Sequence, residues 1–270
     1  MREMNEDFER ALKHFPAEPG NQIVRASLLA QRGELRFGEG WLVYLADDEL
    51  MLAGDPTCEQ STVESVEVCY GLSCGCEAYS DIGSASGLCA GLAALPAPDW
   101  SGFCKADPDW ESSLGSSFDN VIRQERIGFI GKETLPPDGE TRAITANDAL
   151  AVKAINEDWL WKRYSSAQEF CEQGTATVAL LDGEARSVAM VFAADERYAD
   201  IAVATHPDYR ARGLARNAVL ALCQILRECG LIPFWETAAQ NTASRMIPEA
   251  LGWKQVALKP LYYLNRTPRG

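Results

Sequence analysis

The chain has 270 residues, enough for two domains of ordinary size, and its hydrophobic fraction of 47% is that of a globular protein. Its net charge is −14, concentrated in residues 1–140, where 10 Lys and Arg stand against 25 Asp and Glu. This excess argues against a nucleic-acid partner, which needs a cationic surface, and either attracts cationic substrates such as amines or only keeps the protein soluble.

The first half predicts a mixed α/β domain over residues 1–134. The N-terminus is charged and lacks the apolar segment of a signal peptide, and the chain has no run of 18 apolar residues, so we expect a cytoplasmic protein without a membrane span. Helical spacing of apolar residues predicts helices near residues 8–15 and 21–31. Apolar runs on both sides of Asp47-Asp48 predict a hairpin. A strand is expected at residues 62–70, whereas residues 71–117 have no clear pattern.

Nine cysteines, an odd number in a chain without a signal peptide, indicate free thiols. Four of them are close in sequence: Cys69, Cys74, Cys76 and Cys89. Their spacing, C-x4-C-x-C-x12-C, is not a standard zinc or iron–sulfur pattern. We therefore expect these thiols to pack as small hydrophobic side chains, and we expect no metal.

Residues 135–140, with Pro136-Pro137 and Asp138-Gly139, form the best linker in the chain, and a second α/β domain is expected over residues 141–270. In that domain, Asp182-Gly183 between two apolar runs is a strong hairpin signal. The other expected elements are a strand at 142–145, a helix at 149–155, a strand at 198–205, a helix ending near 228, a strand at 232–237, a helix at 242–251, and closing strands at 253–258 and 262–264.

The turn after the strand at residues 199–205 combines small residues with cations at the start of a helix. It reads Arg210, Ala211, Arg212, Gly213, Leu214, Ala215 and Arg216. The first N–H groups of a helix have no intrahelical partner, and the helix dipole adds positive charge there. A glycine lets an anion approach the backbone closely, so the turn predicts a binding site for a pyrophosphate.

The pattern R-x-x-G-x-A, formed by Arg210, Gly213 and Ala215, resembles the acetyl-CoA pyrophosphate loop of the GNAT superfamily of N-acetyltransferases. Residues 235–253 resemble the family's next signature: a strand, an Asn, and a helix that ends in Leu-Gly-aromatic. The segments T-H-P-D-Y-R, P-F-W-E-T and N-x-x-S also resemble the zwittermicin A resistance-type acetyltransferases. The resemblance covers roughly residues 141–265.

The resemblance implies an α/β (α+β) fold with a mixed, centrally splayed sheet flanked by helices. It also implies acetyl-CoA as cosubstrate and a small-molecule primary amine as acceptor, with direct attack of the amine and no covalent enzyme intermediate. The main-chain amide near Val203 would stabilise the oxyanion. The cosubstrate contacts implied by the family pattern are Val203, Ala204, Thr205, the seven residues of the turn, Asn241 and Ser244; Asn241 can equally be a helix cap.

Two carboxylates are candidates for the base that takes the amine proton, Glu236 and Asp200, and either can instead be a solvated strand residue. Many members of the family have a tyrosine about five residues before the Gly-aromatic pair, where it protonates the leaving thiolate, but here Ile247-Pro248 occupies that place. The alternatives left open are a CoA-binding regulatory or scaffold protein without catalysis, and an acyl donor such as succinyl-CoA. Aromatic residues at 159–170 are expected in the core rather than at the acceptor site. The choice between a monomer and a homodimer stays open.

Overall fold

The computed structural model describes residues 5–13, 16–30, 34–38, 41–46, 49–53, 68–73, 76–81, 100–105, 111, 120–132, 135–161, 164–258 and 260–266. The chain forms two compact units. The first contains Met1–Ile127, Ala238–Gln240 and Ala257–Gly270, and the second contains Gly128–Thr237 and Asn241–Val256. Residues 135–140, the linker suggested by the sequence, belong to the second unit in this division.

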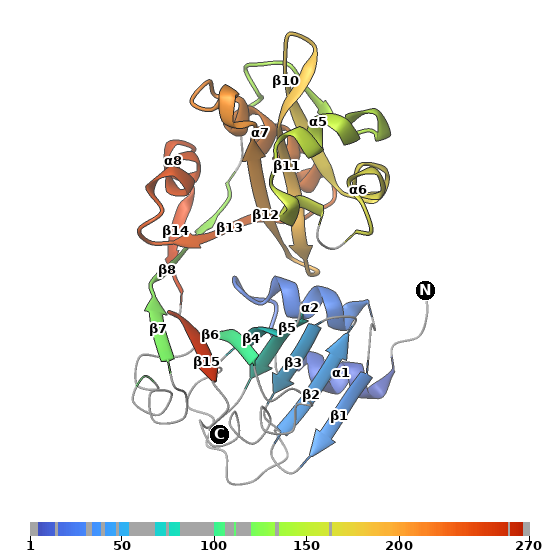
Figure 1. Cartoon of the computed structure of the whole chain (residues 1–270), viewed down its shortest axis with the longest axis vertical. Coiled ribbons are helices and arrows are strands. Elements are labelled where there is room, and N and C mark those ends of the chain that lie inside the picture. Colours follow the sequence, from blue (N-terminus) through green and yellow to red (C-terminus); the bar gives the residue numbers. More distant parts are fainter. Residues whose placement is uncertain are drawn as a thin grey trace. The chain divides into compact units, whose positions relative to one another are not determined.

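The first unit is built on an eight-stranded sheet of order β1-β2-β3-β5-β4-β6-β15-β7 (Figure 1). The antiparallel pairing expected for the two strands that flank Asp47-Asp48 is confirmed by β2 and β3, whereas the two aspartates lie outside the described residues. The region without a clear sequence pattern contributes β5, β6 and part of β4. The elements are α1 (Glu6–Leu12), α2 (Gln22–Leu29), β1 (Glu34–Gly38), β2 (Trp41–Ala46), β3 (Glu49–Ala53), β4 (Val68–Ser73), β5 (Cys76–Asp81), β6 (Trp100–Lys105), β7 (Asn120–Gln124) and β15 (Leu261–Arg266).

The last strand belongs to this sheet and not to the sheet of the second domain, which residues 262–264 were expected to close. β15 lies between β6 and β7, with Tyr262 opposite Cys104 on one side and Arg123 on the other. The prediction was wrong because alternation of side chains reveals a strand but not the sheet that it joins.

The second unit is built on a seven-stranded mixed sheet of order β14-β8-β13-β12-β11-β10-β9, which confirms the predicted α/β class. Its strands are β8 (Arg126–Ile130), β9 (Thr141–Ala143), β10 (Ala176–Leu181), β11 (Glu184–Ala194), β12 (Tyr198–Thr205), β13 (Ile232–Ala238) and β14 (Lys254–Ala257). Its helices are α5 (Ala149–Ala154), α6 (Ala167–Gln173), α7 (Leu214–Glu228) and α8 (Thr242–Ala250), with short 3-10 turns η2 (Ala146–Asp148), η3 (Asp158–Trp161) and η4 (Pro207–Tyr209).

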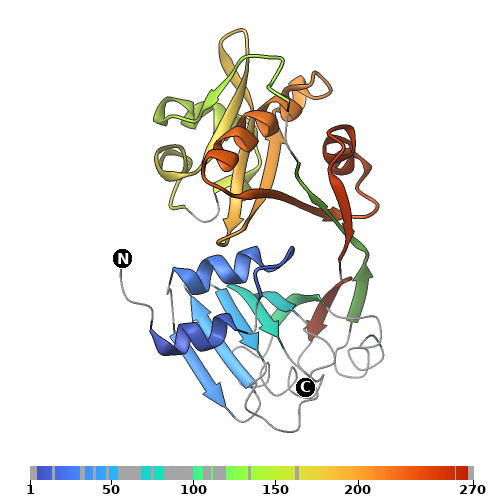
Figure 2. The same ribbon diagram turned by 180° about the vertical axis from the view of Figure 1, so that it is seen from behind.

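Helices cover both faces of the sheet in this second unit (Figures 1 and 2). Thr177 points toward α7, because its Oγ1 donates a hydrogen bond to the carbonyl of Ala218 at 2.7 Å. The next residue, Val178, points to the other face and packs in the core with α5 and α6. Phe170 lies fully buried in that core, as the sequence predicted, whereas Trp159 is 37% exposed.

The hairpin predicted at Asp182-Gly183 is confirmed. Both residues have positive φ, 55° and 77°, the signature of a type I′ turn between right-twisted strands. At the far end of α7, Gly230 has φ 75°, and the N–H groups of Gly230 and Leu231 donate back to Arg227 and Leu226. These two hydrogen bonds form a Schellman motif, which explains why the helix ends there.

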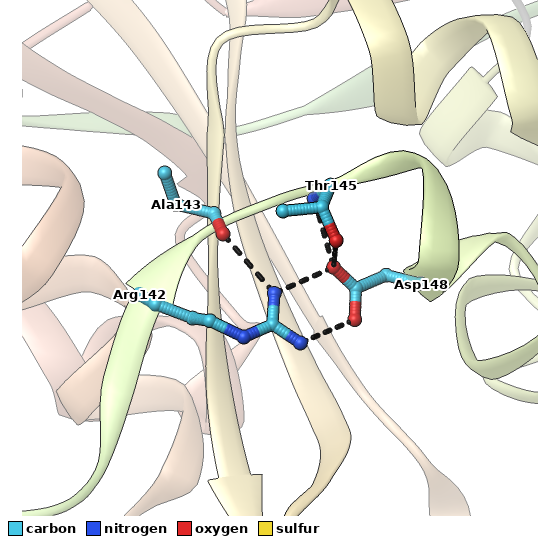
Figure 3. A network of polar contacts seen from close by, with 4 residues as sticks. All are labelled: Arg142, Ala143, Thr145 and Asp148. Atoms are coloured by element: carbon cyan, nitrogen blue, oxygen red, sulfur yellow. Dashed lines mark hydrogen bonds and ion pairs between the residues drawn. The ribbon is translucent and has the colours of Figure 1, made fainter.

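An ion pair between a buried carboxylate and a partly exposed guanidinium holds the segment between β9 and α5 (Figure 3). Asp148 is only 4% exposed, and both nitrogens at the tip of the Arg142 guanidinium donate to its two oxygens at 2.7 Å. The N–H and the hydroxyl of Thr145 donate to the same carboxylate at 2.8 and 2.9 Å, and the bond from the N–H is one of the two bonds of a capping box between Thr145 and Asp148.

Three cysteines of the described chain are free thiols: Cys171 and Cys223 are buried, and Cys229 is exposed. Cys74 and Cys89 lie outside the described residues. Among the residues that the structure describes, no group of three or more His, Cys, Asp or Glu side chains could hold a metal ion. No helix in the described part of the chain is long and apolar enough to cross a membrane.

Candidate active site

The parallel strands β12 and β13 pair along only part of their length. The ladder begins at Tyr198–Ile232 and ends at Asp200–Phe234. Each strand continues past that point, β12 to Thr205. Within these described residues, the remainder of β12 pairs with β11 on its other side but not with β13. The sheet is therefore splayed at its centre, as predicted.

The main chain of β12 directs Val203 toward this open edge. The carbonyl of Arg197 accepts the N–H of Ile232 on the β13 side, and the N–H of His206 donates to Arg186 on the β11 side, both at 2.9 Å. Because peptide groups alternate in direction along a strand, odd-numbered residues of β12 point toward β13. The N–H and C=O of Val203 therefore project where the partner strand has turned away.

The turn between β12 and α7 has a specialised backbone. Ala211 has φ 60° and Gly213 has φ 79°, so both are left-handed, which costs about 1–2 kcal/mol for the alanine. The N-cap residue of α7, Gly213, has no side chain that could cap the helix, and the first turn of α7 holds no acidic residue. A Cβ added to Gly213 would meet nothing within 4 Å. The first turn of α7 thus carries no acidic residue of its own at the positive end of the helix dipole, and there is room for an anion beside the glycine.

Two arginines of the turn are paired with carboxylates from other segments. The Nη2 of Arg210 lies 3.5 Å from Oε1 of Glu157, and its Nε donates to the carbonyl of Thr205 at 3.3 Å. The Nη1 of Arg216 donates to Oδ2 of Asp138 at 3.1 Å. All of these side chains are at least partly exposed, so each pair contributes little to stability, and solvent and anions can reach the guanidinium groups.

The third arginine joins an aromatic cluster on η4. The guanidinium carbons of Arg186 and Arg212 lie 4.3 and 5.5 Å from the ring centroid of Tyr209. The ring of His206 meets Tyr209 edge-on, with centroids 5.1 Å apart. Cation–π attraction therefore holds two further positive charges close to the turn.

The two candidate bases lie on the same face of the sheet. Asp200 pairs directly with Phe234, so their side chains share a face, and Glu236 follows two residues later on that face. The small residues Ala202 and Ala204 continue the same face of β12 and pack in the core with α5 and α6. Asp200 and Glu236 are both half-buried and lie on either strand of the pair at the point where pairing ends.

The residues expected from the second signature have structural partners. Asn241 caps α8, because its Oδ1 accepts the N–H of Ser244 at 3.1 Å. The Ser244 Oγ accepts a hydrogen bond from Nε1 of Trp235 at 3.0 Å. The capping role of Asn241 is thereby confirmed, while contact with a cosubstrate stays a prediction for both residues. Pro248, near the place of the family's tyrosine, is buried inside α8.

Comparison with known proteins identifies the class. Residues 106–262, more than half of the chain, match the model of the GNAT acetyltransferase family. An uncharacterised N-acetyltransferase from Streptomyces virginiae is 36% identical over 119 residues, which cover 41% of this chain and 50% of that protein. The chain therefore spans about half the length of this curated relative.

Solved structures agree on the fold. A GCN5-related N-acetyltransferase-like protein from Streptococcus suis is 18% identical, with a TM-score of 0.56 over 98% of this chain and 100% of that one. A GCN5-related N-acetyltransferase from Kribbella flavida is 17% identical, with a TM-score of 0.56 over 92% of this chain and 95% of that one. The chain belongs to the GNAT acetyltransferase family, whose members are acyltransferases. The narrower likeness to zwittermicin A resistance-type enzymes stays a prediction.

Sequence reasoning missed the partners of the turn. Glu157 and Asp138 lie 53 and 78 residues before their arginines, and no local pattern signals such pairs. Tyr209 and its arginine neighbour Arg186 were equally hidden, although Tyr209 belongs to the motif T-H-P-D-Y-R. The positive charge of the arginines was the only signal in the sequence, because an exposed cation attracts carboxylates, but it does not indicate which carboxylates.

Proposed function

We propose that this protein is an N-acetyltransferase that transfers an acetyl group from acetyl-CoA to a primary amine of a small molecule. The observation that carries the proposal is the end of the β12–β13 ladder at Asp200–Phe234, next to a turn that leads into the open start of α7. A splayed strand pair offers main-chain donors to an acyl group, and the helix start offers them to phosphates.

The acyl group would lie along Val203, Ala204 and Thr205. The N–H of Val203, which points to the open edge of β12, would donate to the thioester carbonyl as negative charge develops on its oxygen. The pyrophosphate would lie against the turn from Arg210 to Arg216, whose backbone is already in the left-handed conformations that bring N–H groups together. Asn241 and Ser244 would line the part of this site that holds the pantetheine arm of the cosubstrate.

The reaction needs a neutral amine. Glu236 or Asp200 would remove the ammonium proton, directly or through one water, and the free amine would then attack the thioester carbon. The C–N bond forms, the C–S bond breaks, and the thiolate leaves with the electron pair of that bond. The attacking nitrogen gives up its second proton, which passes through water to the thiolate, so that the products are the amide and the thiol of CoA. An ordinary thiol has a pKa of about 8.5, so the thiolate can leave without being protonated by a tyrosine. At the place where many family members have that tyrosine, this chain has the buried Pro248.

The distribution of charge supports the proposed class of acceptor. The excess of 25 acidic over 10 basic residues in residues 1–140 favours encounter with a cation and disfavours nucleic acid. We propose that the acceptor is a small amine that is acetylated in the cytoplasm, and that the reaction uses acetyl-CoA as its only cosubstrate and no metal.

The test measures binding and turnover separately. Acetyl-CoA and CoA are titrated by calorimetry, and thiol release is followed with a panel of small primary amines. We expect micromolar binding, thiol release with some amines, and a loss of turnover without loss of binding in Glu236→Gln or Asp200→Asn. Succinyl-CoA is run beside acetyl-CoA, because the pyrophosphate site does not sense the acyl group. Failure of the wild-type protein to bind CoA would refute the proposal.

The second candidate is a CoA-binding regulatory protein without catalysis. It is favoured by one observation, the proline that stands near the place of the family's tyrosine. A binding module should be indifferent to neutralising both carboxylates. CoA binding without thiol release for any amine, in the wild type and in both variants, would support this candidate over the enzyme.

A further inference from the structure

Two carboxylates from other segments form ion pairs with arginines of the turn between β12 and α7. Asp138 reaches Arg216, and Glu157 reaches Arg210. Neither carboxylate belongs to α7 or to the strands that would hold an acyl group. Each is the single acidic partner that the described structure gives its arginine, and each ion pair joins segments far apart in the sequence.

Asp138 is fixed by a buried anchor on α7. Its N–H donates to Oδ1 of Asn217 at 3.3 Å, and Asn217 is only 7% exposed. Gly139 sits against the same amide, where a Cβ would lie 2.6 Å from Nδ2 of Asn217. The backbone beside the first turn of α7 is therefore held closely, and the carboxylate is delivered to Arg216 at little additional entropic cost.

Glu157 is fixed by an indole. Its Oε2 accepts a hydrogen bond from Nε1 of Trp159 at 2.8 Å, while its Oε1 faces Arg210. Arg210 is in turn oriented by the bond from its Nε to the carbonyl of Thr205, at the end of β12. One carboxylate thus links η3 to the strand end where the turn begins.

We propose that Asp138 and Glu157 compete with the phosphates of the cosubstrate for Arg216 and Arg210. Each neutralises one arginine of the turn in the free protein and gives it up when CoA binds. The exchange lowers the affinity of the site for CoA, which favours release of the CoA product. This inference rests on the proposed function, since it needs CoA to bind at the turn.

The size of the effect follows from the exposure of the pairs. Asp138 and Arg216 have side chains 74% and 33% exposed, and Glu157 and Arg210 are 36% and 59% exposed. Exposed pairs of this kind are weak, so removing either carboxylate should tighten CoA binding about two- to fivefold. The gain should shrink as salt is added, because these charges are accessible to solvent.

The experiment is calorimetric titration of CoA into the wild type, Asp138→Asn and Glu157→Gln at low salt. Both substitutions are close in shape to the native residues, and Asp138→Asn keeps the main-chain bond to Asn217. A third titration uses Asp138→Asn in an Arg216→Gln background. If the carboxylate acts through Arg216, this added substitution changes the affinity of the Arg216→Gln protein much less than that of the wild type.

Asp208→Asn is the matched control for long-range charge. Asp208 lies on η4 beside the turn, is 83% exposed, and is 3.9 Å from His206 rather than on an arginine of the turn. We expect it to tighten CoA binding less than Asp138→Asn does. The inference is overturned if Asp138→Asn and Glu157→Gln both bind CoA no more tightly than the wild type does, or if Asp208→Asn gains as much affinity as they do. In either case, CoA binding by the wild type still supports the proposed function. A wild-type protein that does not bind CoA overturns both.

Discussion

The ion pair between Arg142 and the buried carboxylate of Asp148, before α5, allows a quantitative test of the structure. In Asp148→Asn, an amide replaces a carboxylate that accepts two bonds from Arg142 and two from Thr145 (Figure 3). One end of the amide then presents N–H groups to a guanidinium that also donates. A lost hydrogen bond to a charged group costs about 1.5–3 kcal/mol.

The partial exposure of Arg142, at 41%, reduces the penalty for leaving it without a charged partner. We therefore expect the free energy of unfolding to fall by about 2 kcal/mol. At about 2–4 °C for each kcal/mol in a chain of this size, the melting temperature should drop by about 4–8 °C. Urea unfolding followed by tryptophan fluorescence measures the change.

The effect should depend on pH in a defined direction. Burial raises the pKa of Asp148, but the bonds from Arg142 and Thr145 outweigh burial and hold its pKa below the usual value. A lowered pKa in the folded state gives stability that is complete above the unfolded value of about 3.9 and is lost as pH falls through the folded value. The difference between wild type and variant should be full at pH 7 and close only at pH values below about 3.9.

The exposed pair Arg245–Glu249 serves as the control. The Nε and Nη2 of Arg245 donate to Oε1 of Glu249 at 3.0 and 2.7 Å, but the side chains are 34% and 43% exposed. Glu249→Gln should cost less than about 0.5 kcal/mol. The reasoning is refuted if Asp148→Asn is as stable as the wild type at pH 7, or if the two variants lose the same free energy.

Three further predictions test separate features. Ala211→Gly should raise the free energy of unfolding by about 0.5 kcal/mol, because it relieves a left-handed alanine at φ 60°; a lower melting temperature would contradict this. Burial raises the pKa of the Cys171 thiol to about 11 and that of Cys223 to about 12, so iodoacetamide at pH 8 should label the exposed Cys229 before either of these two; mass spectrometry of the native protein that found Cys171 or Cys223 labelled as fast as Cys229 would contradict this. Asn241→Ala should cost about 1 kcal/mol in chemical denaturation, through loss of the α8 cap; unchanged CoA affinity in that variant would remove Asn241 from the binding site and leave it a cap alone.

The local features of this fold could be predicted because their causes lie within a few residues. Asp182-Gly183 adopts the turn that its residue types favour, and Gly213 takes the left-handed conformation that its place between strand and helix requires. Asn241 caps a helix for the same reason, since its partner Ser244 is three residues away. The cosubstrate turn was predictable from such local rules together with the family resemblance.

The remaining features depend on contacts between distant segments. Nothing near Tyr262 reveals that its strand pairs with β6 and β7 rather than with the acetyltransferase sheet. Nothing near Arg216 reveals Asp138, which lies 78 residues away. Choice of sheet and choice of ionic partner are decided by packing across the whole unit, so a single sequence predicts the elements and the turn but not these pairings.

The measurement that tests the central claim most directly is the titration of acetyl-CoA and CoA into three proteins: the wild type, Gly213→Asp and Gly230→Asp. The two glycines lie just beyond opposite ends of α7, have φ of 79° and 75°, and would each place a Cβ in open space. The backbone strain of the two substitutions is therefore matched, but only Gly213→Asp puts a negative charge where the phosphates are proposed to lie. The account predicts that the wild type and Gly230→Asp bind both ligands and that Gly213→Asp does not. Wild-type affinity in Gly213→Asp, or equal loss in both variants, would contradict it.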